Sequence, residues 1–148
     1  MMPALVAAGA AAILSASCVR LLPGPPPEDP AAVVERHILC AGVKETGEWA
    51  EPGEPKSAFK NGEDGAVVSF LQFRNLQGAH TLAWKWYDPA RALIRSSEPV
   101  AIGLDGRQFE RIVAWDRIVL HDARDPGFWT VVVLIDGRVA NSRAFEIR

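Results

Sequence analysis

The sequence has little cysteine, little net charge and no long apolar segment. Two cysteines, Cys18 and Cys40, allow at most one disulfide, and a net charge of −2 gives no field that would attract nucleic acid. The longest uncharged apolar stretch, residues 4–16, is shorter than the roughly 20 residues that span a bilayer. These absences exclude a disulfide-rich scaffold and argue against a polyanion partner and a membrane-spanning helix.

The N-terminal segment has the composition of an export signal. Small residues follow the apolar stretch at positions 15–17, and Cys18 comes next. This arrangement resembles the lipobox of bacterial lipoproteins, in which the cysteine becomes the lipidated first residue of the mature chain. The resemblance implies that residues 1–17 are a signal peptide and that Cys18 carries a lipid. It places the protein in the periplasm or at the outer membrane, bound to the membrane through that lipid.

Ordinary cleavage of the signal is the alternative. An oxidising compartment would then permit a disulfide between Cys18 and Cys40. The two outcomes exclude each other, and with a lipidated Cys18 we expect Cys40 to be a small buried hydrophobe.

A proline-rich linker separates the signal from the rest of the chain. Residues 22–30 contain too many prolines for a helix or a central strand, so residues 18–32 are expected to be an extended tether. The remaining residues, 33–148, are expected to form one globular domain.

Apolar residues in this domain recur at a period near two, which is typical of strands with one buried face. A long charged loop is expected at residues 44–65. The expected strands cover residues 35–43, 66–74, 80–87, 92–96, 100–104, 112–120, 129–135 and 138–147. Seven or eight strands with no helix predict an all-β fold, namely a two-sheet antiparallel sandwich.

Several local patterns sharpen this prediction. Leu82, Trp84 and Trp86 alternate with more polar residues, so they are expected to fill the space between the sheets. Two Asp-Gly dipeptides, at 105–106 and 136–137, lie between β-rich runs and predict hairpin turns.

Two segments resemble the immunoglobulin-like modules of exported bacterial proteins. Residues 125–137 combine a Pro-Gly turn, a tryptophan strand and an Asp-Gly turn, and the domain ends on Phe145-Glu146-Ile147. Residues 80–89 resemble the central tryptophan strand of such modules and the proline turn after it. The resemblance implies an immunoglobulin-like sandwich with an adhesion, assembly or binding role. The chain lacks the inter-sheet cysteine pair of antibody domains, so packing alone is expected to hold the sheets together.

No pattern predicts a catalytic or metal-binding site. His37, His80 and His121 have no spacing typical of metal ligands, and His121-Asp122 lacks the context of a catalytic pair. The acidic residues of the long loop lack the pattern of a calcium loop. We therefore expect no enzyme activity, no metal and no other cofactor.

The strand at 129–135 is apolar on both faces. Trp129 and its alternate neighbours form one face, whereas Thr130, Val132 and Leu134 form the other, which Tyr87 would extend if its strand is adjacent. The loop at 44–65 is the expected cover, and a second copy or another protein is the alternative. Trp49, within the loop, is either packed against its own domain, which we favour, or available to a partner.

These observations predict an envelope protein with a protein-binding or assembly role. Its partner would be another envelope protein or a second copy of the chain. The alternative, from a different class, is a module that binds carbohydrate or peptidoglycan through exposed tryptophans; complete burial of Trp49, Trp86 and Trp115 would argue against it.

Overall fold

A computed structural model describes residues 34–121 and 125–148 of the chain. The expected signal peptide, the linker and Cys18 lie outside these residues. The described residues contain strands and turns but no helix, and hence no helix that could cross a membrane.

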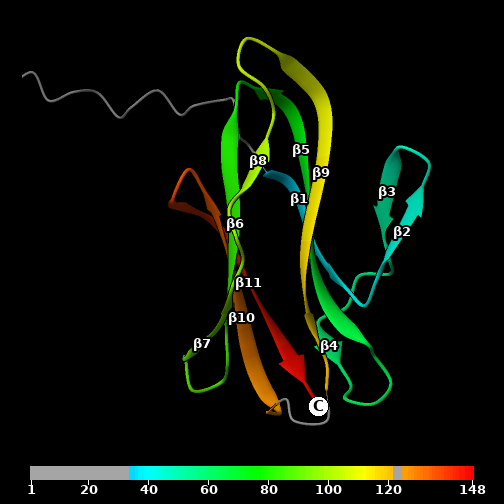
Figure 1. Cartoon of the computed structure of the whole chain (residues 1–148). Coiled ribbons are helices and arrows are strands. Elements are labelled where there is room, and N and C mark those ends of the chain that lie inside the picture. The colour runs from blue at the N-terminus through cyan, green and yellow to red at the C-terminus, as the bar shows by residue number, and fades with distance from the viewer. Residues whose placement is uncertain (1–33, 122–124) are drawn as a thin grey trace, which may run out of the picture.

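Two sheets face each other (Figure 1). The first, which we call the β5 sheet, has the order β1-β5-β9. Its strands are β1 (Val34–Cys40), β5 (Ala66–Gln77) and β9 (Gln108–Val119). All its pairings are antiparallel.

The second, which we call the β10 sheet, has the order β4-β11-β10-β6-β7, with β8 also paired to β6. Its strands are β4 (Ala58–Phe59), β6 (His80–Tyr87), β7 (Leu93–Ser96), β8 (Val100–Ile102), β10 (Gly127–Ile135) and β11 (Arg138–Ile147). Only the short β4 runs parallel to its neighbour. The order β1-β5-β9 against β7-β6-β10-β11 corresponds to strands A-B-E against C′-C-F-G of an immunoglobulin-like sandwich, so the expected fold class is confirmed.

A separate hairpin, β2 (Val43–Thr46) and β3 (Trp49–Pro52), lies against the outer face of the β5 sheet (Figure 1). Apart from Val43, it falls within residues 44–65, which the sequence predicted to be a loop, and the same segment contains β4. The prediction was wrong because these strands have only 2 to 4 residues each, too few to show the apolar alternation that identifies longer ones.

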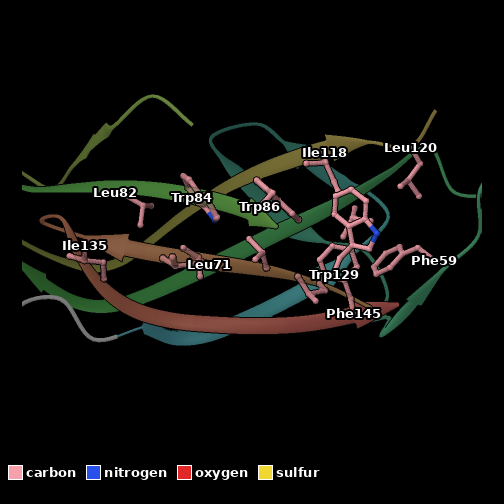
Figure 2. Packing of buried hydrophobic residues seen from close by; sticks show 14 of the residues in the cluster. Phe59, Leu71, Leu82, Trp84, Trp86, Ile118, Leu120, Trp129, Ile135 and Phe145 are labelled. Carbon is pink, nitrogen blue, oxygen red and sulfur yellow. The ribbon is translucent and has the colours of Figure 1, made fainter. Parts of the chain in front are cut away.

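The core between the sheets is rich in aromatic side chains (Figure 2). Trp86 and Trp129 pack around Phe145 of β11, with ring centres 5.9 and 6.4 Å away, and Phe59 of β4 meets the same ring edge-on at 5.8 Å. Trp84 is buried further along β6. The predicted inward face of β6 is therefore confirmed.

Polar side chains also connect the two sheets. The indole N–H of Trp84 donates to Ser69 Oγ on β5 at 3.0 Å, and that of Trp86 donates to Asp116 Oδ2 on β9 at 2.8 Å. Arg95 of β7 binds the same carboxylate at 2.8 Å. The expectation that packing alone holds the sheets was wrong, because hydrogen bonds across the core supplement it.

The Trp84 bond is the first of a directed chain. Ser69 Oγ lies 2.7 Å from His37 Nε2, and His37 Nδ1 lies 2.8 Å from Asn141 Oδ1 on β11. Since an amide oxygen only accepts, His37 donates from Nδ1, so its Nε2 accepts the Ser69 hydroxyl proton. Each donor and acceptor is satisfied when His37 is neutral.

The hairpin turn at Asp136-Gly137 is confirmed. Both residues have positive φ, 52° and 76°, as a primed turn requires, and Ile135 pairs with Arg138. The Asp136 carboxylate also accepts hydrogen bonds from the Thr81 N–H at 2.9 Å and from the His80 ring at 2.7 Å, which ties the turn to β6.

The turn at Asp105-Gly106 is not a hairpin. It connects β8, which belongs to the β10 sheet, with β9, which belongs to the β5 sheet. The dipeptide favours a tight turn in either setting, so its presence did not reveal that the chain changes sheets here.

His37 gives folding stability a pH dependence. Burial lowers its pKa below the usual value of about 6.5, against the opposing effect of the Asn141 hydrogen bond. Stability from the neutral ring is thus fully present above about pH 6.5 and decreases as the pH falls toward the folded-state pKa, because only the unfolded chain takes up the proton readily. We expect the urea midpoint to fall between about pH 7.5 and 5.5, and to fall less in the His37→Gln variant. Equal pH slopes for both proteins would contradict this assignment.

Candidate binding surface

Four of the residues expected to form a binding surface lie together on the outer face of the β10 sheet. Strands β6 and β10 are neighbours, and Tyr87 lies directly opposite Thr130. Val132 and Leu134 follow on the same face of β10, and each is half-buried. Ala83 lies opposite Leu134, so the apolar surface extends onto β6.

The long loop does not cover this surface. Its β2–β3 hairpin packs on the opposite sheet, where Ala50 is buried with Cys40, Val68 and Phe70. The expected cover was therefore wrong. The outer face of β5 is also apolar, and the short connection from β1 to β2 delivers the hairpin to that side.

Phe128 is a further member that the sequence analysis did not identify. Its side chain is 71% exposed and begins the same face of β10, two residues before Thr130. The sequence did indicate that Phe128 faces outward, because Trp129 is expected in the core and neighbours on a strand point to opposite faces. We call the residues Tyr87, Phe128, Thr130, Val132 and Leu134 the β10 face.

An open depression lies at one end of the β10 face. It has a volume of about 590 Å³, and Tyr87, Pro89 and Phe128 line it. Gly127 permits this arrangement, since a Cβ at its φ of 131° would meet Pro89 at 2.9 Å. The turn after β6 can therefore approach the start of β10 closely.

Charged residues border the β10 face. Lys85 lies opposite Val132, and Glu146 lies opposite Phe128. The surface thus has an apolar centre bordered by charges of both signs, which is the general anatomy of a protein-binding patch.

Trp49 lies elsewhere. It begins β3, is half-buried, and its ring centre is 5.1 Å from the Arg111 guanidinium of β9. The expectation that it packs against its own domain is confirmed, and it does not contribute to the β10 face. Trp86 is fully buried, whereas Trp115 is half-buried and stacks on Phe70 at 6.1 Å.

The polar residues considered in the sequence have structural partners. Cys40 is buried, donates to the Gly42 carbonyl at 3.1 Å, and has its pKa raised by burial. Ser69 and His37 are hydrogen-bonded, but Ser69 is fully buried and no substrate reaches its hydroxyl. Among residues 34–121 and 125–148, no three potential ligands are gathered around a metal site. Asp122 lies outside the described residues.

Substitutions at two adjacent residues test whether the β10 face is uncovered. Val132→Glu places a carboxylate on the half-buried outer face, opposite Lys85, and we expect a loss of less than about 1 kcal/mol in the free energy of unfolding. Val133→Glu forces the same charge into the core and should prevent folding. Circular dichroism with urea titration measures both. Unfolding of the Val132→Glu protein would show that the chain itself covers this face.

Comparison with known proteins gives a likeness in fold only. No protein-family model matches the sequence, and no curated protein matches it. The chain is similar to an alkylpurine DNA glycosylase, AlkC of Pseudomonas fluorescens, solved bound to DNA containing an abasic site analog, with 12% identity and a TM-score of 0.51. The match covers 80% of this chain but only 30% of the glycosylase.

A second similar structure is an immunoglobulin-like protein of Pseudomonas aeruginosa, PA1606. The identity is 12% and the TM-score 0.45, and the match covers 79% of this chain and 96% of that one. At such identities the likeness says nothing of activity or partner. The described chain is an antiparallel immunoglobulin-like β-sandwich.

Proposed function

We propose that this protein is exported, is anchored to a membrane by a lipid on Cys18, and binds another envelope protein through the β10 face. The observation that carries the proposal is an apolar outer face that no other described part of the chain covers. Its most prominent member, Phe128, leaves 71% of its side chain exposed.

The composition of the β10 face supports a protein as the partner. Tyr87 and Phe128 are large and stiff, so they lose little conformational entropy when they become buried, and aromatic residues often dominate binding energy. Val132 and Leu134 add apolar area at the centre. A strand with one face in the core and an apolar second face gains stability when a partner covers it.

Export and anchoring rest on the sequence before residue 34. The apolar stretch, the small residues before Cys18 and the proline-rich linker together favour a module held a short distance from a membrane. Such an anchor restricts the sandwich to partners near the same membrane surface, which raises their effective concentration.

A saccharide is the second candidate ligand. Trp49 is only half-buried and lines an open pocket of about 400 Å³ together with Arg36 and Arg111. An accessible indole beside cationic and amide groups suits a sugar ring. This candidate uses the opposite sheet from the β10 face, so one set of variants separates the two.

Site-specific photo-crosslinking in the intact envelope tests the proposal. A photoreactive residue in place of Phe128 or Leu134 should yield one discrete adduct, whereas one in place of Leu104, an exposed apolar residue in the β8–β9 turn, should not. The adduct should disappear in the Val132→Glu chain, which keeps its fold. Its mass distinguishes another protein from a second copy, and mass spectrometry of the captured chain shows whether it begins at a lipidated Cys18.

Two results would overturn the proposal. One is an adduct of equal yield from all three positions, and the other is an adduct that the Val132→Glu substitution leaves unchanged. Tryptophan fluorescence that responds to peptidoglycan fragments in the wild type, but not in a Trp49→Ala chain, would favour the saccharide instead.

A further inference from the structure

The outer edge of β9 is a long strand edge without a neighbour. The strand spans 12 residues and pairs along one side with β5. Among the described residues, no strand pairs with its other side. Between Arg111 and Arg117, every second residue therefore directs its backbone N–H and C=O groups toward an open edge, where another strand can bind them.

The other edges of the sandwich are shorter or partly covered. β11 has 10 residues, and β4 pairs with it only at Glu146 and Ile147, so the rest of its outer edge has no strand neighbour among the described residues. The Lys56 N–H donates to the Leu39 carbonyl of β1 at 2.8 Å. The edge of β6 is divided between β7 and β8, which have 4 and 3 residues. β9 is thus the longest edge in the described part of the chain, and no described strand pairs with any of it.

Side chains on the outer face of β9 form a symmetric pattern. Val113 and Trp115 are half-buried and pack against the smaller core cluster under the β2–β3 hairpin. Arg111 and Arg117 flank them at equal spacing and are exposed. Neither arginine forms an ion pair with a described residue. The edge therefore presents positive, apolar, apolar and positive side chains at alternate positions.

We propose that β9 binds an extended segment of a partner protein as an added strand, and that this segment alternates acidic, apolar, apolar and acidic residues on one face. Backbone hydrogen bonds supply the attachment, as in other strand additions. Carboxylates directly opposite Arg111 and Arg117 supply the selectivity, because opposite charges across paired strands attract.

A second copy of the chain does not fit this edge. In the antiparallel pairing that a two-fold axis would give around this stretch, Arg111 of one chain lies opposite Arg117 of the other. Like charges directly opposite each other destabilise a strand pair. The same two arginines that select an acidic segment therefore oppose self-association at this edge.

The inner side of the edge cannot provide the same selectivity. Asp116 points inward and already binds the Trp86 indole and Arg95. On the outer side, Arg111 and Arg117 pair with no carboxylate of the described residues, so this side can select the charge of an added strand. This proposal concerns a different sheet from the β10 face, so it stands or fails independently of the proposed function.

A designed peptide tests the inference on the purified full chain. The labelled peptide Glu-Thr-Val-Thr-Val-Thr-Glu carries the required pattern, and Lys-Thr-Val-Thr-Val-Thr-Lys is its charge-reversed control. We expect the acidic peptide to bind and to slow hydrogen–deuterium exchange of β9 amides. Binding of the lysine peptide should be weaker by about tenfold, the sum of two exposed charge contacts.

Charge reversal in the protein provides the decisive comparison. In the double variant Arg111→Glu with Arg117→Glu, the preference should reverse, so that the lysine peptide binds more tightly than the acidic one. The double variant Arg138→Glu with Arg143→Glu changes the net charge equally but lies on β11, and it should keep the original preference. Circular dichroism confirms that both variants are folded.

The inference is overturned if the acidic peptide leaves β9 exchange unchanged, or if the β11 variant alters the preference as much as the β9 variant does. A reversal confined to the β9 variant supports it, because a general charge effect or a loss of folding would not invert the ranking of two peptides.

Discussion

Two tryptophans of one strand attach the two sheets to each other. Trp84 and Trp86 lie side by side on the inner face of β6, and each places a large ring in the core while its N–H donates to a polar atom of the facing sheet. Ser69 and Asp116 are those acceptors, and each belongs to a wider network: Ser69 to the chain that ends at Asn141, and Asp116 to the pair with Arg95. A buried donor or acceptor without its partner is costly, so these hydrogen bonds fix the offset of the sheets as well as their separation.

In antibody domains a disulfide supplies this connection. Here a free Cys40 faces the opposite side of the β5 sheet, under the β2–β3 hairpin.

The registration of the sheets determines which surfaces are left open. With Trp129 and its alternate neighbours in the core, Phe128, Thr130, Val132 and Leu134 must face outward, and the pairing with β6 brings Tyr87 beside them. On the other sheet, β9 is held by β5 on one side and by the Asp116 hydrogen bonds from the core, and no described strand pairs with its second edge. The two surfaces differ in chemistry. The β10 face is apolar and suited to a folded partner, whereas the β9 edge offers backbone groups and two arginines and is suited to an extended acidic segment.

Much of the fold followed from alternation along the chain. The bounds of β6 and β11 agreed with expectation. The inward face of β6 followed from its alternation of apolar and more polar residues, and that of β10 from the position of Trp129. The hairpin at residues 43–52 and the polar links across the core could not be anticipated in this way. Strands of four residues are too short to show a period. Ser69 and Asp116 resemble any other polar strand residue until their partners on the facing sheet are known. The candidate surface was identified from the two apolar faces of β10, but its cover was assigned wrongly. A strand that is apolar on both faces and covered by the long loop does exist, but it is β5: its residues 66–73 are all buried because the β2–β3 hairpin lies on its second face. Phe128 was missed, although an inward Trp129 implies that its neighbour on the strand points outward. Trp49 packs against its own domain as expected, but its separation from the β10 face became known only with the strand pairing.

The attachment of the sheets through the β6 indoles is tested most directly by a double-mutant cycle. Trp84→Phe removes the indole N–H, Ser69→Ala removes its acceptor, and urea unfolding of the wild type, the two single variants and the double variant gives their coupling free energy. Because the single Ser69→Ala change leaves a buried donor without a partner, the two losses should not add, and we expect a coupling of about 1 kcal/mol or more. Losses that add within about 0.3 kcal/mol would contradict the account, since they would show that these tryptophans contribute through packing alone.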